Sequence, residues 1–462
     1  MTTSSPEQAG RTKGLTLWPA TALVTGTIIG SGIFTLPAAL AEYGPISLVG
    51  FAITSVGAVL LALVFASLAR RTPDVGGPYA FARHGFGDFV GFQSAWTYWI
   101  GAWAGVAAIS VSFVGYLGDL IPVVADNRIL GVACAVGAIA ILTLVNIRGV
   151  VTGGLLSLVL TILKIVPLLL IGTLGFIAFD AADLGAFNTL ELPPLAVITT
   201  VMALTLFSFI GVESATIPAG DVHEPEKTIP RATVIGTVLA ASVYLLSTAA
   251  VFGAVPNEQL SESAAPFSVA ASAMFGDWAG PAVSVVAVIS CLGAMNGLIL
   301  LSGQVPMAAE IDGLAPRVFG KRNRFRAPWT GLIIAGALAA GFTMFNFAEG
   351  DLVSVYAQLL LISTVTTMVP YAFSAAAEMK WLLIDRGNLR VAHFARAMTI
   401  AVLALAYTIF AFYGAGESEV YWGFLLILIG IPIYVLILWD RRNKSGSGDS
   451  GDAPAPQDAV SA

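Results

Sequence analysis

Apolar runs of about 20 residues, separated by short charged segments, fill this sequence from residue 15 to residue 440. An α-helix rises about 1.5 Å per residue, so a run of this length crosses a hydrocarbon core about 30 Å thick. Charged residues make up 11% of the chain and hydrophobic residues 57%, whereas about a quarter of an ordinary soluble domain is charged. The sequence therefore predicts an all-α polytopic membrane protein.

We predict about twelve transmembrane helices from these runs. They cover residues 15–43, 45–69, 88–117, 129–147, 150–179, 195–220, 232–253, 278–308, 329–347, 352–379, 396–413 and 420–439. The segments 1–14 and 441–462 are polar and are predicted to be disordered.

Positive charge predicts the orientation of the chain in the membrane. When both termini are placed in the cytoplasm, all of the 22 Lys and Arg except Arg128 and Lys164 fall on the cytoplasmic side, while the opposite loops are acidic. This distribution obeys the positive-inside rule. We therefore expect a multi-pass protein of the plasma (bacterial inner) membrane with both termini cytoplasmic.

The first span carries an unusual run, "GTIIGSGIF" (26–34), with three glycines and two hydroxyl side chains. Glycine costs a helix about 1 kcal/mol relative to alanine, and Ser or Thr can satisfy backbone groups that are freed where a helix opens. The spacing of Gly26 and Gly30 also fits a simple close contact between helices. The first run alone leaves both interpretations open.

A second run of this kind, "FSFIGVESATIPAG" (207–220), interrupts the sixth span. Spans one and six lie five apart, so they cross the membrane in opposite directions. Paired interruptions at matching positions of two antiparallel halves are typical of secondary transporters with inverted repeats. We therefore predict a first repeat over 15–179, a second over 195–379, and two appended helices over 396–440.

Unwound backbone at the membrane midplane predicts the kind of ligand. Helix N-termini favour a carboxylate, while helix C-termini and free carbonyl groups favour an ammonium group. A zwitterion such as an α-amino acid satisfies both. An ATP-driven pump is excluded because the Walker motif G-x-x-x-x-G-K-[ST] is absent from the sequence. An enzyme would need a cluster of reactive groups at depth, and a channel would not explain the paired interruptions.

Five segments carry a resemblance to a known family: "GTIIGSGIFTLPAAL", "GGPYAFARHGFGDFVGFQSAWTYWI", "FSFIGVESA", "EPEKTIPRA" and "CLGAMNGLILLSGQ". Together they resemble the amino acid–polyamine–organocation (APC) superfamily, and most of all its basic amino acid/polyamine antiporter branch. The resemblance runs from about residue 15 to residue 440. It implies a LeuT-type five-plus-five inverted repeat, with discontinuous helices one and six and transport by alternating access.

The resemblance also implies where the substrate binds. The carboxylate site falls on the backbone N–H groups of Ser31 and Gly32 with the Ser31 hydroxyl, and the ammonium site on the carbonyl groups of Ile28, Phe207 and Ile210. Phe207 takes the place of a tryptophan lid in the arginine antiporter. The predicted substrate site comprises Thr27, Ile28, Gly30, Ser31, Gly32, Phe207, Ser208, Ile210, Gly211, Val106, Leu298 and Ser363.

Three positions depart from the arginine antiporter. Leu298 replaces a tryptophan, Val106 replaces an asparagine, and Thr27 replaces a second asparagine. A guanidinium group needs hydrogen-bond acceptors or an aromatic face, and two of these partners are aliphatic here. We therefore predict proton-coupled uptake of neutral, apolar L-amino acids. The alternatives are a sodium-independent amino acid exchanger or a cationic amino acid/polyamine antiporter.

Lys164 lies near the centre of the fifth span, about 15 residues from each interface, or roughly 22 Å along a helix. That distance is too long for the side chain to snorkel to water. Charge inside a membrane normally marks a transport pathway or a proton relay, and burial favours the neutral form of a lysine. We predict that Lys164 carries the coupling proton; the resemblance implies that its ammonium replaces a sodium ion.

Glu213 and Tyr98 complete the predicted gating residues. The resemblance assigns Glu213 to gating or proton-linked release, although it could also cap backbone groups in the broken sixth span. Tyr98 matches a family gate position, and residues 70–87 match a re-entrant cytoplasmic element. We expect no metal site and no cofactor other than the proton. The expected partners are an amino acid substrate and the lipid bilayer, not nucleic acid, and the resemblance suggests a homodimer.

Overall fold

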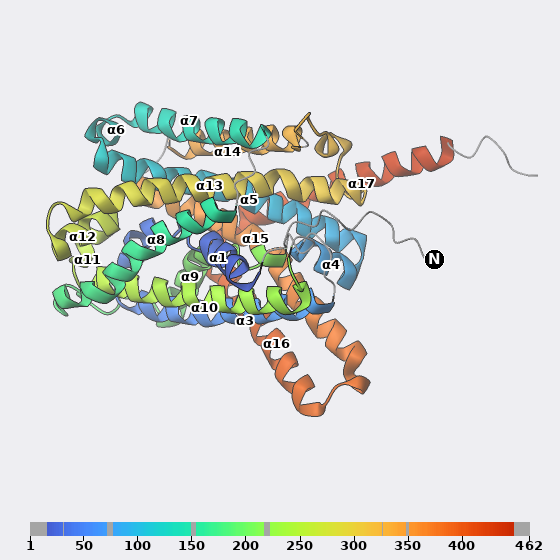
Figure 1. Cartoon of the computed structure of the whole chain (residues 1–462), viewed down its shortest axis with the longest axis horizontal. Helices are drawn as coiled ribbons and strands as arrows, with labels where there is room; N and C mark the ends of the chain where they lie inside the picture. Colours follow the sequence, from blue (N-terminus) through green and yellow to red (C-terminus); the bar gives the residue numbers. More distant parts are fainter. Residues whose placement is uncertain are drawn as a thin grey trace, which may run out of the picture.

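A computed structural model describes residues 16–30, 32–71, 77–148, 154–216, 222–325, 327–347 and 351–447. These residues form helices joined by turns and loops, with no β-strand among them (Figure 1). Within this part of the chain, ten helices are long and apolar enough to cross a membrane, and a bent pair of helices makes an eleventh. The prediction of an all-α polytopic membrane protein is confirmed.

The elements of the first half begin with a bent pair. They are α1 (Leu17–Ile28) with α2 (Gly32–Ala41), α3 (Ile46–Arg71), α5 (Asp88–Leu120), α7 (Arg128–Ile147) and α8 (Gly154–Leu174). The helix α8 lies in the predicted span 150–179, of which residues 150–153 lie outside the described ranges. Two short helices, α4 (Pro78–Phe86) and α6 (Pro122–Asp126), connect the long ones.

The second half repeats this order. It contains α9 (Pro194–Leu206) with the 3₁₀ turns η3 (Phe207–Phe209) and η4 (Ser214–Thr216), then α10 (Pro225–Phe252), α13 (Ala279–Ile311), α14 (Trp329–Phe347) and α15 (Leu352–Ile384). The short helices α11 (Asn257–Ser261) and α12 (Pro266–Phe275) lie between α10 and α13. They take the place in this half that α4 takes in the first.

Helices at matching positions of the two halves pack against each other. The pairs are α3 with α10, α5 with α13, and α7 with α14 (Figure 1). The pair α5 and α13 runs antiparallel, because Gly105 approaches Leu298 while Asp119, further along α5, accepts a hydrogen bond from the earlier residue Ser284. This is the arrangement expected for an inverted five-plus-five repeat.

Two ends of the bundle can be distinguished. The helix α4 and the C-terminal part of the last helix, α17 (Glu417–Ser447), lie at one end, which we call the α4 end. The helices α6, α11 and α12 lie at the other, which we call the α12 end (Figure 1). The basic residues Arg71, Arg83 and Lys380 belong to the α4 end, where each bonds to a group on another segment.

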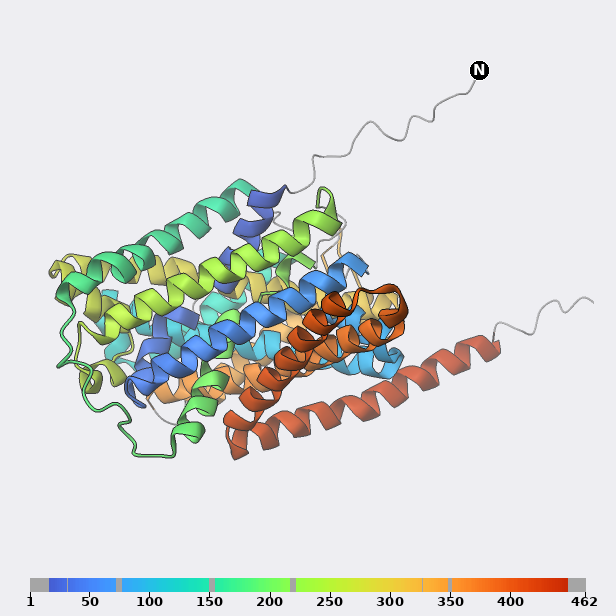
Figure 2. The same ribbon diagram turned by 90° about the horizontal axis from the view of Figure 1, so that it is seen from below.

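The last two helices, α16 (Val391–Gly414) and α17 (Glu417–Ser447), lie on the outside of the bundle (Figure 2). The large side chains of Trp422 and Trp439 on α17 are mostly exposed, as expected for a helix that faces lipid. The helix α17 continues to Ser447, so the disordered tail does not begin at 441 as predicted. Cationic residues such as Arg441 stabilise the C-terminal end of a helix, which accounts for the longer helix.

Candidate substrate site

The first span is interrupted between α1 and α2, as predicted. The two helices are bent by 40° relative to each other. The amide of Gly30 donates to the carbonyl of Ile28 (2.6 Å), which ends the regular helical bonding, and the helix resumes at Gly32. Ser31, a predicted carboxylate ligand, lies outside the described residues. The break leaves backbone groups at mid-span that no regular helix would expose.

The second interruption follows α9. After the turn η3, Ile210 has an extended backbone and Gly211 a positive φ of +106°. A Cβ on Gly211 would lie 2.7 Å from Cγ2 of Thr27, so only glycine permits this contact. Gly211 therefore lets the two breaks touch. Residues 217–221, which include Pro218 and Gly220 of the predicted run, lie outside the described residues.

Two tyrosines, which the sequence did not single out, bind the carbonyl groups at the breaks. The hydroxyl of Tyr244 on α10 lies 2.6 Å from the carbonyl oxygen of Ile28 and 3.1 Å from that of Ser208, so it bridges both interruptions. The hydroxyl of Tyr356 on α15 donates to the carbonyl of Gly32 (2.9 Å). These bonds stabilise unwound backbone that water does not reach.

The predicted side-chain pocket converges on Phe207. A Cβ on Gly32 would meet Cδ1 of Phe207 at 3.3 Å, and a Cβ on Gly105 would meet Cε2 of the same ring at 3.3 Å. The Gly105 position is also 3.0 Å from Leu298 and 3.2 Å from Oγ of Ser363. Phe207 thus lies between the first break and the wall that these residues form, which is where a lid over a substrate would be needed.

Hydroxyl groups at the site differ in what they can offer a ligand. Thr27 donates to the carbonyl of Leu23 (2.7 Å) and Ser363 to that of Gly101 (2.7 Å), so both protons are already engaged. Among the described residues, no partner lies within hydrogen-bond distance of the buried hydroxyl of Ser208. Since buried polar groups are normally paired, Ser208 is available to bind a substrate, in contrast to Thr27 and Ser363.

Lys164 lies against the first break. Its ammonium is almost fully buried and lies 3.4 Å from the carbonyl oxygen of Gly26. It also lies beside Gly293 of α13, because a Cβ there would be 3.6 Å from Nζ. The snorkelling interpretation is excluded by this position. The ammonium places a positive charge where unwound carbonyl groups would otherwise attract a cation.

Glu213 is fully buried and lies two residues after Gly211 in the second break. Its carboxylate accepts hydrogen bonds from the hydroxyls of Tyr98 on α5 and Tyr371 on α15, both at 2.6 Å. It also accepts one from the amide of Gly211 at 3.2 Å. The capping interpretation and the gating interpretation are therefore compatible: one carboxylate caps the broken helix and joins it to α5 and α15.

Comparison of the sequence with known proteins identifies the family of this chain. The amino acid permease family model matches residues 15–438. The chain belongs to this family. The permease is 33% identical over 438 residues to the cadaverine/lysine antiporter of Escherichia coli strain K12, which covers 94% of this chain and 97% of the antiporter.

Two further relatives are putrescine transporters named PotE. The permease is 30% identical over 434 residues to that of Escherichia coli strain K12, covering 92% of this chain and 97% of the relative. It is 31% identical over 417 residues to that of Haemophilus influenzae, covering 90% and 94%. These relatives are transporters, which confirms the resemblance to the antiporter branch and the prediction that the permease is not an enzyme.

The relatives favour a different substrate class from the one predicted. Cadaverine, lysine and putrescine all carry ammonium groups at neutral pH, whereas Leu298 and Val106 led us to predict neutral, apolar amino acids. The cationic alternative is therefore better supported by the comparisons. An aliphatic wall contacts the methylene chain of a lysine as readily as it contacts leucine, so Leu298 and Val106 do not decide between the two substrate classes.

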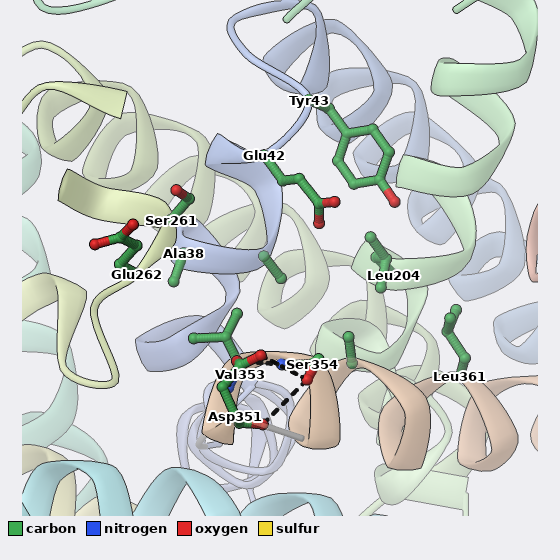
Figure 3. Close-up of a pocket in the computed structure, with 12 residues that line it drawn as sticks. Ala38, Glu42, Tyr43, Leu204, Ser261, Glu262, Asp351, Val353, Ser354 and Leu361 are labelled. Carbon is green, nitrogen blue, oxygen red and sulfur yellow. Dashed lines mark hydrogen bonds between the residues drawn. The ribbon is translucent and has the colours of Figure 1, made fainter. Parts of the chain in front are cut away.

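The permease also has a cavity of about 520 Å³ at the α12 end, shown in Figure 3. Its charged lining residues are all acidic: Glu42 after α2, Glu262 after α11 and Asp351 before α15. Leu204 and Leu361 also line the cavity, and they precede Phe207 and Ser363 by three and two residues. The cavity is therefore built partly from the same chain segments as the substrate site.

Two lining groups have shifted pKa values. Burial, with help from the carboxylates of Glu42 and Glu419, raises the pKa of Tyr43 to about 12, so its phenol stays neutral. Burial also acts to raise the pKa of Asp351, but the hydrogen bonds from Ser354 and Val353 bring it below its ordinary value. Asp351 therefore keeps its negative charge in mildly acidic solution.

Proposed function

We propose that this permease is a sodium-independent antiporter that exchanges cationic amino acids and diamines across the bacterial inner membrane. The acidic cavity at the α12 end carries this proposal. Carboxylates that line a concave surface raise the local concentration of cations, and the effect is greatest for a dication. The relatives that span almost the same length supply the substrate class.

The substrate site fits a long primary amine. An α-carboxylate would bind the amide of Gly32 at the start of α2, where the helix dipole is positive. An α-ammonium would bind the carbonyl groups of Ile28, Phe207 and Ile210. Val106 and Leu298 would pack against the methylene chain, and Ser208 offers an unpaired hydroxyl.

Alternating access follows from the two breaks. Substrate enters from the α12 end, and Phe207 covers it once it is bound. Protonation of Glu213 then weakens its hydrogen bonds to Tyr98 and Tyr371, and this opens the route toward the α4 end. Lys164 supplies the positive charge beside Gly26 that a sodium ion would otherwise provide, so exchange needs no sodium.

Counterflow in proteoliposomes tests this function. Vesicles loaded with lysine should take up labelled cadaverine or putrescine at least about tenfold faster than empty vesicles, in sodium-free buffer. Leucine should neither drive nor inhibit this exchange. The Glu258→Gln variant is the matched control, because Glu258 lies on α11 at the same end but does not line the cavity.

Proton-coupled uptake of neutral amino acids is the second candidate, favoured by the aliphatic side chains of Val106 and Leu298. It predicts that a pH gradient drives leucine into empty vesicles and that lysine does not compete. If Lys164→Ala leaves such uptake unchanged, Lys164 is not its proton carrier. Leucine uptake into empty vesicles, together with absent lysine counterflow, would overturn the antiporter proposal.

A further inference from the structure

A column of buried hydroxyl groups runs between α5 and α15 from Glu213 toward the α4 end. We call the following four side chains the polar column: Tyr98 and Ser94 on α5, and Tyr371 and Ser374 on α15. The two helices run antiparallel, because Gly101 lies against Thr367 while Tyr98 and Tyr371 meet at Glu213. One turn nearer the α4 end, Ser94 and Ser374 therefore lie at the same level.

A second carboxylate, that of Glu378, lies beyond this column toward the α4 end. It is on the same face of α15 as Tyr371, two turns further on, and only 2% of it is exposed. Its Oε1 accepts a hydrogen bond of 2.7 Å from Ser67 of α3. Its Oε2 lies 3.8 Å from Nε of Arg71 and has no hydrogen-bond partner. Arg71 bonds instead to Asp385, which is more exposed.

The charged groups around Glu378 are few. Arg71 from α3, Asp385 from the end of α15 and His393 from α16 act on it electrostatically. The cations nearest on the α4 side have other partners, since Lys380 donates to the carbonyl of Gly85 and Arg83 pairs with aspartates. Among the described residues, Arg71 is the cation that approaches this carboxylate, and it lies at the α4 end.

Among the described residues, no hydrogen-bond partner lies near the buried Oγ of Ser94 or the buried Oε2 of Glu378. Ser374 donates to the carbonyl of Pro370 (2.7 Å), so it can accept a proton from a neighbour and pass one on only by exchanging this bond. Buried polar atoms of this kind are commonly paired with internal water, which needs two to four polar neighbours. Water at these two points would join the hydroxyl groups into a continuous hydrogen-bonded path between the two carboxylates.

We propose that Glu378 is the proton donor and acceptor at the α4 end, and that the polar column carries protons between it and Glu213. A proton from the solution binds the Glu378 carboxylate. One proton then moves along the hydroxyl groups and water to the Glu213 carboxylate, and Glu378 becomes ionised again. Protonated Glu213 accepts more weakly from Tyr98 and Tyr371, so the route to the α4 end opens. This inference rests on the proposed role of Glu213 in gating.

The test measures counterflow while the pH is changed on one side of the vesicle at a time. For the unmodified permease, the rate should rise as the pH falls at the α4 end, by up to about tenfold per pH unit for a single titrating group. Glu378→Gln should abolish this dependence and leave any dependence on the pH at the α12 end unchanged. Ser374→Ala should reduce it.

The matched control is Asp385→Asn, which removes the other acidic partner of Arg71 and should keep the pH response. Lysine binding measured by calorimetry checks that each variant is folded. A Glu378→Gln variant that binds lysine and keeps the full response overturns the inference while the antiporter proposal stands. Absent counterflow in the unmodified permease overturns the proposed function itself.

Discussion

The acidic residues at the two ends of the bundle differ in their surroundings. At the α12 end, Glu42, Glu262 and Asp351 line a cavity, and the described residues of its lining include no basic side chain. At the α4 end, Asp312 bonds to Arg83 (2.8 Å) and to the hydroxyl of Tyr79 (2.7 Å), which joins α4 to α13. Because these bonds join neighbouring elements at the α4 end, we call it the closed end, and we call the α12 end with its cavity the open end.

The closed end is held by groups that do not lose their charge or their proton near neutral pH. Burial and the hydrogen bond to Asp312 raise the pKa of Tyr79 far above its ordinary value, so this phenol remains a donor. Burial acts to lower the pKa of Arg83, but the interactions with Asp88 and Asp312 outweigh burial and raise the pKa above its ordinary value. This behaviour fits the proposal that Glu213, and not these surface groups, responds to protons.

The largest expected effect comes from Glu213→Gln, which removes the charged acceptor between the two ends. Two charge-assisted hydrogen bonds of about 1.5 kcal/mol each stabilise the closed state, so their loss shifts the permease roughly a hundredfold toward the state open at the α4 end, and exchange slows because the closed state rarely forms again. Tyr98→Phe removes one of these bonds and should cost about tenfold. Counterflow in proteoliposomes measures both. Equal rates for Glu213→Gln and the unmodified permease would show that the closed end does not depend on this carboxylate.

Asp312→Asn should loosen the closed end. The pair with Arg83 is partly exposed, so its loss is worth about 1 kcal/mol, or roughly a fivefold shift toward the state open at the α4 end. A cysteine placed at Ser94, in a chain whose two native cysteines are replaced, should react faster with an impermeant thiol reagent supplied at that end. The control is Asp440→Asn, which removes an exposed pair with Arg317. An unchanged reaction rate would remove Asp312 from the closure.

Neutralising the cavity at the open end should have a smaller effect. Replacement of both Glu42 and Glu262 by glutamine should raise the KM for a diamine about threefold to tenfold at low salt, and less at high salt, because solvent screens exposed charges. The kcat should not change. Glu258→Gln again serves as the control. A KM that stays constant would show that the cavity does not attract the substrate.

The smallest expected effect concerns the N-terminus of α15. Asp351 accepts hydrogen bonds from the amides of Val353 and Ser354, so Asp351→Ala should cost about 1 kcal/mol of stability. The pKa of Asp351 is lowered in the folded state, so its contribution is present above its ordinary pKa and is lost as the pH falls through the lower value.

Thermal unfolding in detergent at pH 7 and at about pH 3 measures this contribution, because the ordinary pKa of an aspartate is about 3.9. The difference between Asp351→Ala and the unmodified permease should shrink at the lower pH. Asp126→Ala changes an exposed acid at the same end and should show no such loss. A difference that does not vary with pH would mean that the charge of Asp351 contributes nothing.

The sequence predicted the helices and both interruptions because each rests on a local signal. Apolar length sets the spans, and glycine with hydroxyl residues marks the breaks. Tyr244 could not be predicted in the same way, since a tyrosine in an apolar span usually indicates packing and its carbonyl partners lie far away in the sequence. The acidic cavity was also missed, although the acidity of its loops was noted, because Glu42, Glu262 and Asp351 come from three distant segments.

The substrate preference shows a different kind of limit. Leu298 and Val106 predict an aliphatic wall, and in the structure Leu298 lies beside Gly105 and Ser363. An aliphatic wall suits leucine and the stem of lysine equally well, so the side chains at the wall do not decide between them. The acidic cavity at the α12 end favours the cationic substrates that we propose.

Gly211 sets a boundary for engineering. Its positive φ and its contact with Thr27 leave no room for a side chain. A library that randomises the binding region to change cargo should therefore recover many residues at 106 and 298 but only glycine at 211. New selectivity can therefore be obtained by replacing residues near this contact, but not by replacing Gly211.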